Sequence, residues 1–150
     1  MSLSVDIEKK LGAFTLHSKF EAPDETMALL GASGCGKSTA LNLISGLLSP
    51  TAGRIFFGED DVTDLPPENR GVGLVFQNYA LYPHLTVKQN ILFPLQNLKG
   101  EDKLSKEEML ARAYDAAKLV QIEGLMDRKP KALSGGQQQR VAIARALVKM

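Results

Sequence analysis

A glycine-rich stretch at residues 31–39, GASGCGKST, has the residue types and spacing to hold a phosphate chain. It matches the pattern G-x-x-x-x-G-K-[ST]. Its glycines allow a tight turn whose backbone N–H groups point at phosphate oxygens, and its lysine adds a full positive charge. Its first hydroxyl is an oxygen ligand of the kind that Mg²⁺ prefers. The candidate phosphate-binding residues are Gly31, Ala32, Ser33, Gly34, Cys35, Gly36, Lys37, Ser38 and Thr39.

The elements expected around this stretch are those that a phosphate-binding loop needs. Residues 26–30 are predicted to form a short buried strand, and residues 40–47 carry apolar side chains at helical spacing. A helix that begins near Lys37 directs the positive end of its dipole at the loop. Strand, loop and helix in this order favour a phosphate site over a chance glycine-rich turn.

A single polar residue, Gln77, follows a second predicted buried strand at residues 72–76. Open α/β sheets bind ligands beyond the carboxyl ends of their strands. The amide oxygen of Gln77 could therefore reach Mg²⁺ or an attacking water. We assign Lys37 and Gln77 as candidate catalytic residues, and Ser38 and Gln77 as candidate metal ligands.

A second candidate anion site begins at Ser134, which is a favourable helix N-cap. Gly135 and Gly136 follow it and leave the N–H groups of the first helical turn uncovered, and Gln137 completes the group. Such a helix N-terminus can receive a phosphate. From physics alone, an ordinary capped helix explains these residues as well.

The rest of the chain supplies a frame for these sites. Residues 3–7 and 14–20 are predicted to form antiparallel strands, and residues 54–57 form another strand. The acidic run Glu59, Asp60, Asp61 lacks the alternation of a Ca²⁺ loop, so we interpret it as a turn.

Helical signals dominate the later part of the chain. Thr86 can cap a helix that Pro94 soon interrupts, and Ser105 with Glu108 forms a capping box at the start of another. Residues 85–132 are therefore predicted to form an inserted helical lobe, with residues 1–84 and 133–150 as the nucleotide-binding core.

Composition excludes several classes of protein. The 150 residues are 44% hydrophobic and 23% charged, as in an ordinary globular domain, and the net charge of +1 gives no reason to expect nucleic-acid binding. A single cysteine excludes an intramolecular disulfide framework. No apolar run has the length of a membrane span, and the first residues do not resemble a signal peptide. We expect a cytoplasmic location.

With both glycine-rich motifs in view, the chain resembles the ATP-binding subunit of ABC transporters. Leu133 and the residues 134–137, placed after a helical lobe and followed by QQRVAIARAL, match the ABC signature, and Gln77 stands where the Q-loop glutamine falls. The resemblance implies an α/β fold: a P-loop NTPase (ABC ATPase) core with an N-terminal antiparallel β part and an inserted helical lobe, incomplete at the C-terminus. The ligands that it implies are ATP and Mg²⁺.

Residues 61–70 and 75–87 look like those of importer ATPases for sugars, polyamines, ferric iron, molybdate or sulfate. The resemblance implies a head-to-tail dimer with a second ATP-binding subunit, in which Ser134, Gly135 and Gly136 of one subunit cap the γ-phosphate held by the other. It also implies membrane-spanning permease subunits contacted near residues 79–84, an extracytoplasmic solute-binding protein reached indirectly, and a peripheral place on the inner face of the cell membrane. The aromatic residues at 79–84 fit a packed loop equally well.

The chain also departs from the family pattern. Leu11 stands about where members carry an aromatic residue that stacks on adenine, and Phe14 is the nearest aromatic. The family continues after the signature helix with an apolar strand ending in Asp-Glu, which these 150 residues do not contain. Because that Glu polarises the attacking water, we expect this chain to bind ATP and to hydrolyse it very poorly.

Two alternatives stay open on the sequence alone. One is an ABC ATPase outside transport, acting in DNA repair or translation. The other is a truncated, non-catalytic nucleotide-binding regulator, whose only support is the missing Asp-Glu strand.

Overall fold

The computed structural model describes residues 1–98 and 100–150. Lys99, which falls in the predicted helical lobe, lies outside the described residues. The chain divides into two compact units, Met1–Val72 and Gly73–Met150. Each unit has its own hydrophobic core.

An antiparallel sheet with the strand order β2-β1-β3-β4 forms the base of the first unit. Its strands are β1 (Leu3–Leu11), β2 (Phe14–Ala22), β3 (Ala52–Phe57) and β4 (Asp60–Asp61). The predicted hairpin and third strand are confirmed. Val5 pairs with Phe20 on one side and with Ile55 on the other, so β1 is the central strand.

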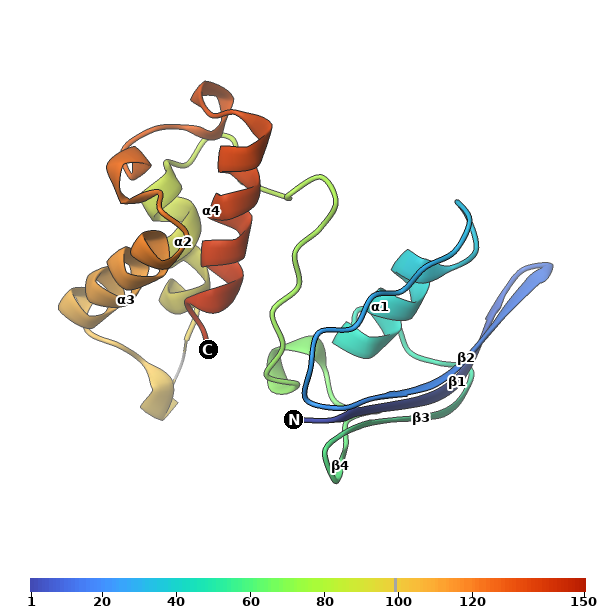
Figure 1. Ribbon diagram of the computed structural model, residues 1–150. Coiled ribbons are helices and arrows are strands. Elements are labelled where there is room, and N and C mark those ends of the chain that lie inside the picture. The colour runs from blue at the N-terminus through green and yellow to red at the C-terminus, as the bar shows by residue number, and fades with distance from the viewer. Residues whose placement is uncertain (99) are drawn as a thin grey trace. The chain divides into compact units, whose positions relative to one another are not determined.

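Helix α1 (Lys37–Ser45) covers one face of this sheet (Figure 1). Its buried Ala40 and Leu43 pack against inward-facing residues of the strands. The buried residues of this core are Val5, Ile7, Leu16, Ala40, Leu43, Ile55, Phe57 and Val62. The helix that begins at the phosphate loop is thereby anchored to the sheet.

Two predicted strands are absent from the part of the chain that the structure describes. Residues 26–30 and 72–76 run without regular pairing, and Leu30 is 91% exposed. A strand needs a neighbour to receive its N–H and C=O groups. The only sheet among residues 1–98 and 100–150 contains β1 to β4, and neither segment joins it. The prediction of buried strands was wrong at both places.

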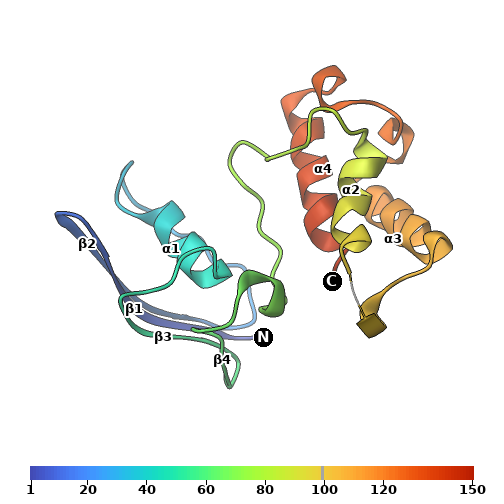
Figure 2. The same cartoon turned by 180° about the vertical axis from the view of Figure 1, so that it is seen from behind.

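Three helices form the second unit: α2 (Val87–Gln96), α3 (Lys106–Leu119) and α4 (Gly135–Leu147). They lie side by side in both views (Figures 1 and 2). Their apolar faces share one core. Its buried residues are Val87, Ile91, Leu95, Ala113, Ala116, Ala117, Ile122, Met126, Leu133, Val141, Ala144 and Val148. Short 3-10 turns at Pro67–Asn69, Gly100–Asp102, Glu123–Leu125 and Pro130–Ala132 complete the described structure.

All three helices of this unit begin at a capping box, in which the N-cap hydroxyl and the third helical side chain satisfy each other's backbone N–H groups. The predicted caps at Thr86, Ser105 and Ser134 are confirmed. Pro94 does not interrupt α2, which continues to Gln96. Proline carries no N–H, so the helix lacks the one hydrogen bond that residue 94 would otherwise donate.

No helix of the described residues is both long and apolar enough to cross a membrane.

Candidate functional site

The phosphate-binding loop leads directly into α1. Gly34 and Gly36 have φ angles of 81° and 98°, in the left-handed region that favours glycine. Gly36 is the N-cap of α1, and no side chain in the described structure caps the helix. The N–H groups of its first turn are therefore available to an anion, which is the arrangement that a phosphate requires.

Close packing restricts the loop at Gly31 and Gly36. A Cβ atom built on Gly31 would lie 2.6 Å from Sγ of Cys35, and one built on Gly36 would lie 2.8 Å from Cδ1 of Leu16. The second contact joins the loop to β2. The sequence therefore needs glycine at 36 both for its φ angle and for space.

Lys37 folds over the loop. Its Nζ donates hydrogen bonds to the carbonyl oxygens of Gly31 (2.7 Å) and Ala32 (2.9 Å), and it lies 3.7 Å from Sγ of Cys35. The ammonium group thus lies within reach of any phosphate in the loop. Ser38, in the first turn of α1, is exposed, and Thr39 beside it is half-buried. These residues suit a phosphate chain with a hard cation at its side, which is the fit expected for MgATP.

The other predicted site residues belong to the second unit. Gln77 is exposed at the start of a turn, and the N–H of Tyr79 donates to the carbonyl of Phe76 (2.9 Å) in that turn. At the start of α4, the Ser134 hydroxyl accepts from the N–H of Gln137 (3.3 Å). The Ser134 N–H donates to Oε1 of Gln137 (2.9 Å).

Gly135 and Gly136 leave the first turn of α4 open. A Cβ atom built on either would meet no atom within 4 Å. A phosphate can therefore approach this helix end from outside the unit. The side-chain amide of Gln138, in the first turns of α4, donates to the carbonyls of Pro130 (3.2 Å) and Leu133 (3.3 Å). These bonds fasten the segment that precedes the helix.

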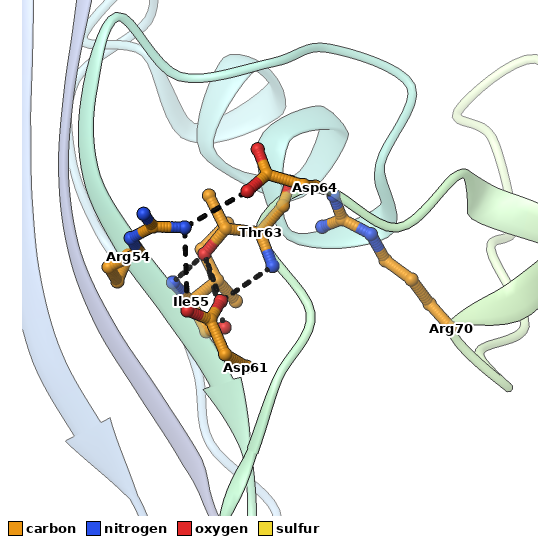
Figure 3. Close-up of polar contacts among 6 residues, drawn as sticks. All are labelled: Arg54, Ile55, Asp61, Thr63, Asp64 and Arg70. Atoms are coloured by element: carbon orange, nitrogen blue, oxygen red, sulfur yellow. Dashed lines mark hydrogen bonds and ion pairs between the residues drawn. The ribbon is translucent and has the colours of Figure 1, made fainter.

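The acidic run at residues 59–61 serves a structural purpose at Asp61. Its carboxylate accepts hydrogen bonds from the N–H (3.0 Å) and hydroxyl (2.6 Å) of Thr63 and pairs with Arg54 at 3.4 Å (Figure 3). The Thr63 hydrogen bonds, followed by the Arg54 charge, lower the pKa of Asp61. Within residues 1–98 and 100–150, no group of three His, Cys, Asp or Glu side chains could hold a metal ion.

Three positioning residues were missed by the sequence reasoning. Arg70 is only 6% exposed and donates to a carbonyl at the end of α1. Asn90 is fully buried and donates to the carbonyl of Tyr82. Arg145 of α4 donates to the carbonyl of Ala80, in the loop before α2. The sequence could have indicated Arg145 as a charged residue beside the apolar face of the predicted last helix. Asn90 likewise lies among apolar residues of α2.

Leu11 and Phe14 pair at the tip of the β1–β2 hairpin and are both exposed. Their large apolar side chains are therefore available for contact with a flat ring.

The comparisons with known proteins agree with these motifs. The family described as ABC transporter matches residues 18–150. The chain is 53% identical over 124 residues to the Fe(3+) ions import ATP-binding protein FbpC of Fusobacterium nucleatum, covering 83% of this chain and 32% of that protein. It is 49% identical over 144 residues to the sulfate/thiosulfate import ATP-binding protein CysA of Caulobacter vibrioides, covering 94% of this chain and 42% of that protein.

Solved structures give the same answer about the fold. A dimeric structure of MJ0796, a bacterial ABC transporter cassette, matches with a TM-score of 0.78 and 35% identity, over 99% of this chain and 70% of that one. MJ1267, an ATP-binding cassette of an ABC transporter, matches with a TM-score of 0.84 and 27% identity, over 99% and 64%. The predicted fold class is confirmed. The chain spans about one third of the length of the first curated relatives that it matches.

Proposed function

Because the chain belongs to the ABC transporter family, we propose that it is part of an ATP-binding subunit that energises the import of a solute. The observation that carries the proposal is the loop at residues 31–39, with Lys37 folded over it and the uncapped first turn of α1 at its end. The relatives, which are import ATP-binding proteins, do not favour a non-transport ATPase or a regulator.

The loop residues hold the phosphates of ATP. When a nucleotide enters, Lys37 exchanges the carbonyls of Gly31 and Ala32 for phosphate oxygens, and the first-turn N–H groups of α1 receive the rest of the charge. A structural neighbour of this chain is a post-hydrolysis state with bound ADP and Pi. Ser38 and Gln77 would supply oxygen ligands to Mg²⁺, and Gln77 would also orient the attacking water.

Two subunits are proposed to share each nucleotide. The open first turn of α4, with Ser134, Gly135, Gly136 and Gln137, caps the γ-phosphate bound by the loop of a second subunit. In support, the built Cβ positions of both glycines meet nothing within 4 Å, and the related cassette MJ0796 is dimeric. The side chains of Ser134 and Gln137 cap this helix end, but the space beside Gly135 and Gly136 is empty. That space suits a ligand that arrives from another molecule.

The remaining partners are proposed from an import role. FbpC and CysA are named as import ATP-binding proteins. We extend that role to this chain, with permease subunits at residues 79–84, a solute-binding protein acting through them, and a peripheral place on the inner face of the cytoplasmic membrane. Residues 1–84 and 133–150 then form the nucleotide-binding core, and residues 85–132 form the helical lobe. The relatives serve different solutes, so no single solute is proposed.

A mixing experiment tests the shared site. Lys37→Ala removes the phosphate charge of the loop. Gly135→Asp places a negative charge at the cap, where there is space for it and where an acidic residue does not disfavour the helix. We expect the unmodified chain to associate when ATP is added, and each variant alone to associate weakly. A mixture of the two should associate more than either, because it contains one intact composite site.

The readout is sedimentation velocity with and without MgATP. Gly124→Asp is the matched control, because the built Cβ of Gly124 also meets nothing within 4 Å. The shared site is refuted if Gly135→Asp associates as the unmodified chain does, or if the mixture gains nothing.

A further inference from the structure

The segment at residues 79–84 has an unusual backbone for a loop without regular structure. Tyr79 and Ala80 have φ angles of 62° and 46°. Two consecutive residues with side chains in the left-handed region are uncommon and cost free energy. Such a conformation persists only where neighbouring groups hold it, so the contacts of this turn identify what holds it.

Arg145, in the last turn of α4, holds the start of the segment. Its Nη1 donates to the carbonyl of Ala80 (2.7 Å) and its Nη2 to the carbonyl of Tyr79 (2.9 Å). Its guanidinium carbon lies 5.7 Å from the centre of the Tyr82 ring. The carbonyls of both strained residues thus accept hydrogen bonds from one planar guanidinium group, whose two donors match two adjacent carbonyls.

The guanidinium group is half-buried, and burial lowers the pKa of Arg145 from its usual value. An arginine remains protonated despite such a shift. Its hydrogen bonds are therefore formed by a charged donor, and such bonds are stronger than bonds between neutral groups.

Asn90, fully buried in α2, holds the other end of the segment. Its Oδ1 accepts from the N–H of Tyr82 (2.8 Å), and its Nδ2 donates to the carbonyls of Tyr82 (3.1 Å), Leu85 (3.3 Å) and Thr86 (3.0 Å). Helices α2 and α4 belong to one core. The segment is therefore tied at both ends to a rigid pair of helices.

We propose that Arg145 is a positioning residue that fastens the segment at residues 79–84 to α4, so that the segment and the cap at residues 134–137 move as one body. Ten residues separate Gly135 from Arg145, so a movement of the cap is carried over about 15 Å of helix. This use of the link rests on the proposed function. Under that function, phosphate binding at the N-terminus of α4 shifts the permease contact, which is fastened near the C-terminus of the same helix.

A purely structural role for Arg145 makes a different prediction. A basic residue in the last turn of a helix can stabilise that helix through its dipole. The donors of Arg145, however, bind carbonyls of Tyr79 and Ala80 rather than those of α4. Loss of the link should therefore loosen the segment and leave the helices intact.

Hydrogen exchange in the 150-residue chain tests the link. The N–H of Tyr79 donates to the carbonyl of Phe76, and the N–H of Tyr82 donates to Oδ1 of Asn90. In Arg145→Ala we expect both to exchange at least about tenfold faster, because hydrogen bonds to charged groups ordinarily contribute about that factor. The N–H groups of α2 and α3 should keep their protection. Arg145→Lys, which retains the charge but not the fork, should give an intermediate rate.

Arg140→Ala is the matched control, since Arg140 is an exposed arginine of the same helix. If Arg145→Ala does not fold, the lysine variant carries the comparison. Unchanged exchange at Tyr79 and Tyr82 in the folded variant overturns the proposal. Equal acceleration throughout the helices overturns it too, because it indicates a structural role.

Spin-label distances test the common movement. One label pair joins His84 to Gln139, and a reference pair joins Lys118 to Gln139; all three positions are exposed. Cys35→Ser removes the native cysteine. Arg145→Ala should broaden the distance distribution of the first pair and leave that of the reference pair unchanged. Broadening of both pairs, or of neither, contradicts the proposal. No nucleotide is used, so this result is separate from the test of ATP binding.

Discussion

The unit that contains the phosphate loop and the helical unit hold their functional residues in different ways. In Met1–Val72, the loop follows a segment that pairs with no strand, and it leads into α1. On the α1 side the loop is anchored, because α1 packs on the sheet. In Gly73–Met150, the cap begins a helix whose neighbours all start at capping boxes and share one core.

Under the proposed function, this contrast suits the two tasks. A loop that must close around phosphates benefits from freedom on one side. A cap that must meet a phosphate on another molecule benefits from a rigid support, because geometry set in advance lowers the cost of binding.

The largest test of the contrast concerns the buried polar anchor of the helical unit. In Asn90→Ala, the N–H of Tyr82 and the carbonyl of Leu85 lose their side-chain partner, while the carbonyls of Tyr82 and Thr86 keep the backbone N–H groups of residues 85 and 90 as donors. We expect the free energy of unfolding of this unit to fall by about 2–4 kcal/mol, since stranded buried groups retain their desolvation cost. Helical circular dichroism during urea unfolding measures the change.

Asn97→Ala provides the control for that variant. Asn97 is exposed and donates one hydrogen bond, to the carbonyl of Phe93 at 3.0 Å. Its loss should cost well under 1 kcal/mol, about as a surface substitution does. Equal losses for the two asparagines would show that the helical unit does not depend on its buried anchor.

The corresponding anchor of the first unit is Arg70. Its guanidinium donates to the carbonyls of Leu43 (2.9 Å) and Ile44 (2.9 Å) at the end of α1 and to those of Thr63 (2.8 Å) and Leu65 (2.8 Å). Burial lowers the pKa of Arg70, and the nearby Asp64 opposes that shift. The residue thus ties the phosphate-loop helix to the turn after β4.

Arg70→Ala should destabilise the first unit by about 2–3 kcal/mol, because four carbonyls lose a charged donor. Arg54→Ala is the matched change in the same region (Figure 3). Arg54 forms exposed ion pairs with Asp61 (3.4 Å) and Asp64 (3.0 Å), so its loss should cost about 0–1 kcal/mol. Thermal unfolding of the two variants measures the difference. If Arg54→Ala lowered the stability of the unit as much as Arg70→Ala does, the surface ion pairs would stabilise it as strongly as the buried arginine.

Two serine caps separate stability from function within the helical unit. Ser134→Ala and Ser105→Ala each remove a hydroxyl that accepts an N–H at the third helical position, at 3.3 Å and 3.2 Å. Each should cost about 1 kcal/mol of unfolding free energy. Only Ser134→Ala should weaken the ATP-dependent association measured by sedimentation. An equal loss of association in both would assign the effect to helix stability alone.

The smallest expected effect depends on pH. The Ser105 backbone, followed by its hydroxyl, lowers the pKa of Glu108 in the capping box of α3. A carboxyl whose pKa is lower in the folded state stabilises above its unfolded pKa and loses that contribution as the pH falls through the folded value. The first turn of α3 should therefore loosen below about pH 4, near the ordinary pKa of Glu.

The first turn of α4 serves as an internal reference, because Gln137 occupies the equivalent place and does not titrate. Amide exchange at Glu108 and Gln137, followed from neutral to acid pH, measures the difference. Glu108→Gln should remove the pH dependence. Parallel loosening of both helices would mean that general acid unfolding, and not this carboxyl, is the cause.

The sequence predicted the starts of helices better than it predicted strands for a physical reason. Helix starts depend on a few consecutive residues, so the caps at Thr86, Ser105 and Ser134 could be read directly. Strands depend on partners elsewhere in the chain, so the apolar runs at 26–30 and 72–76 gave a false signal. The candidate phosphate loop could be proposed from the sequence because its chemistry lies within nine residues.

The positioning residues could not be predicted in the same way. Arg70, Asn90 and Arg145 all bind backbone carbonyls, and a carbonyl carries no mark in the sequence. Only the three-dimensional path of the loops brings those oxygens together. The α2 helix likewise passes through Pro94 because the packing of its apolar face outweighs one lost hydrogen bond.

The most direct test of the account is the calorimetric titration of the 150-residue chain with MgATP. The account predicts saturable binding at one site, weakened at least about tenfold in Lys37→Ala, where a charged contact to phosphate is lost. Gly135→Asp should lose less affinity than Lys37→Ala, because its own loop is intact and only the contribution of ATP-linked association is removed. No binding, or equal binding by the Lys37→Ala variant, would contradict the assignment of residues 31–39 as the nucleotide site.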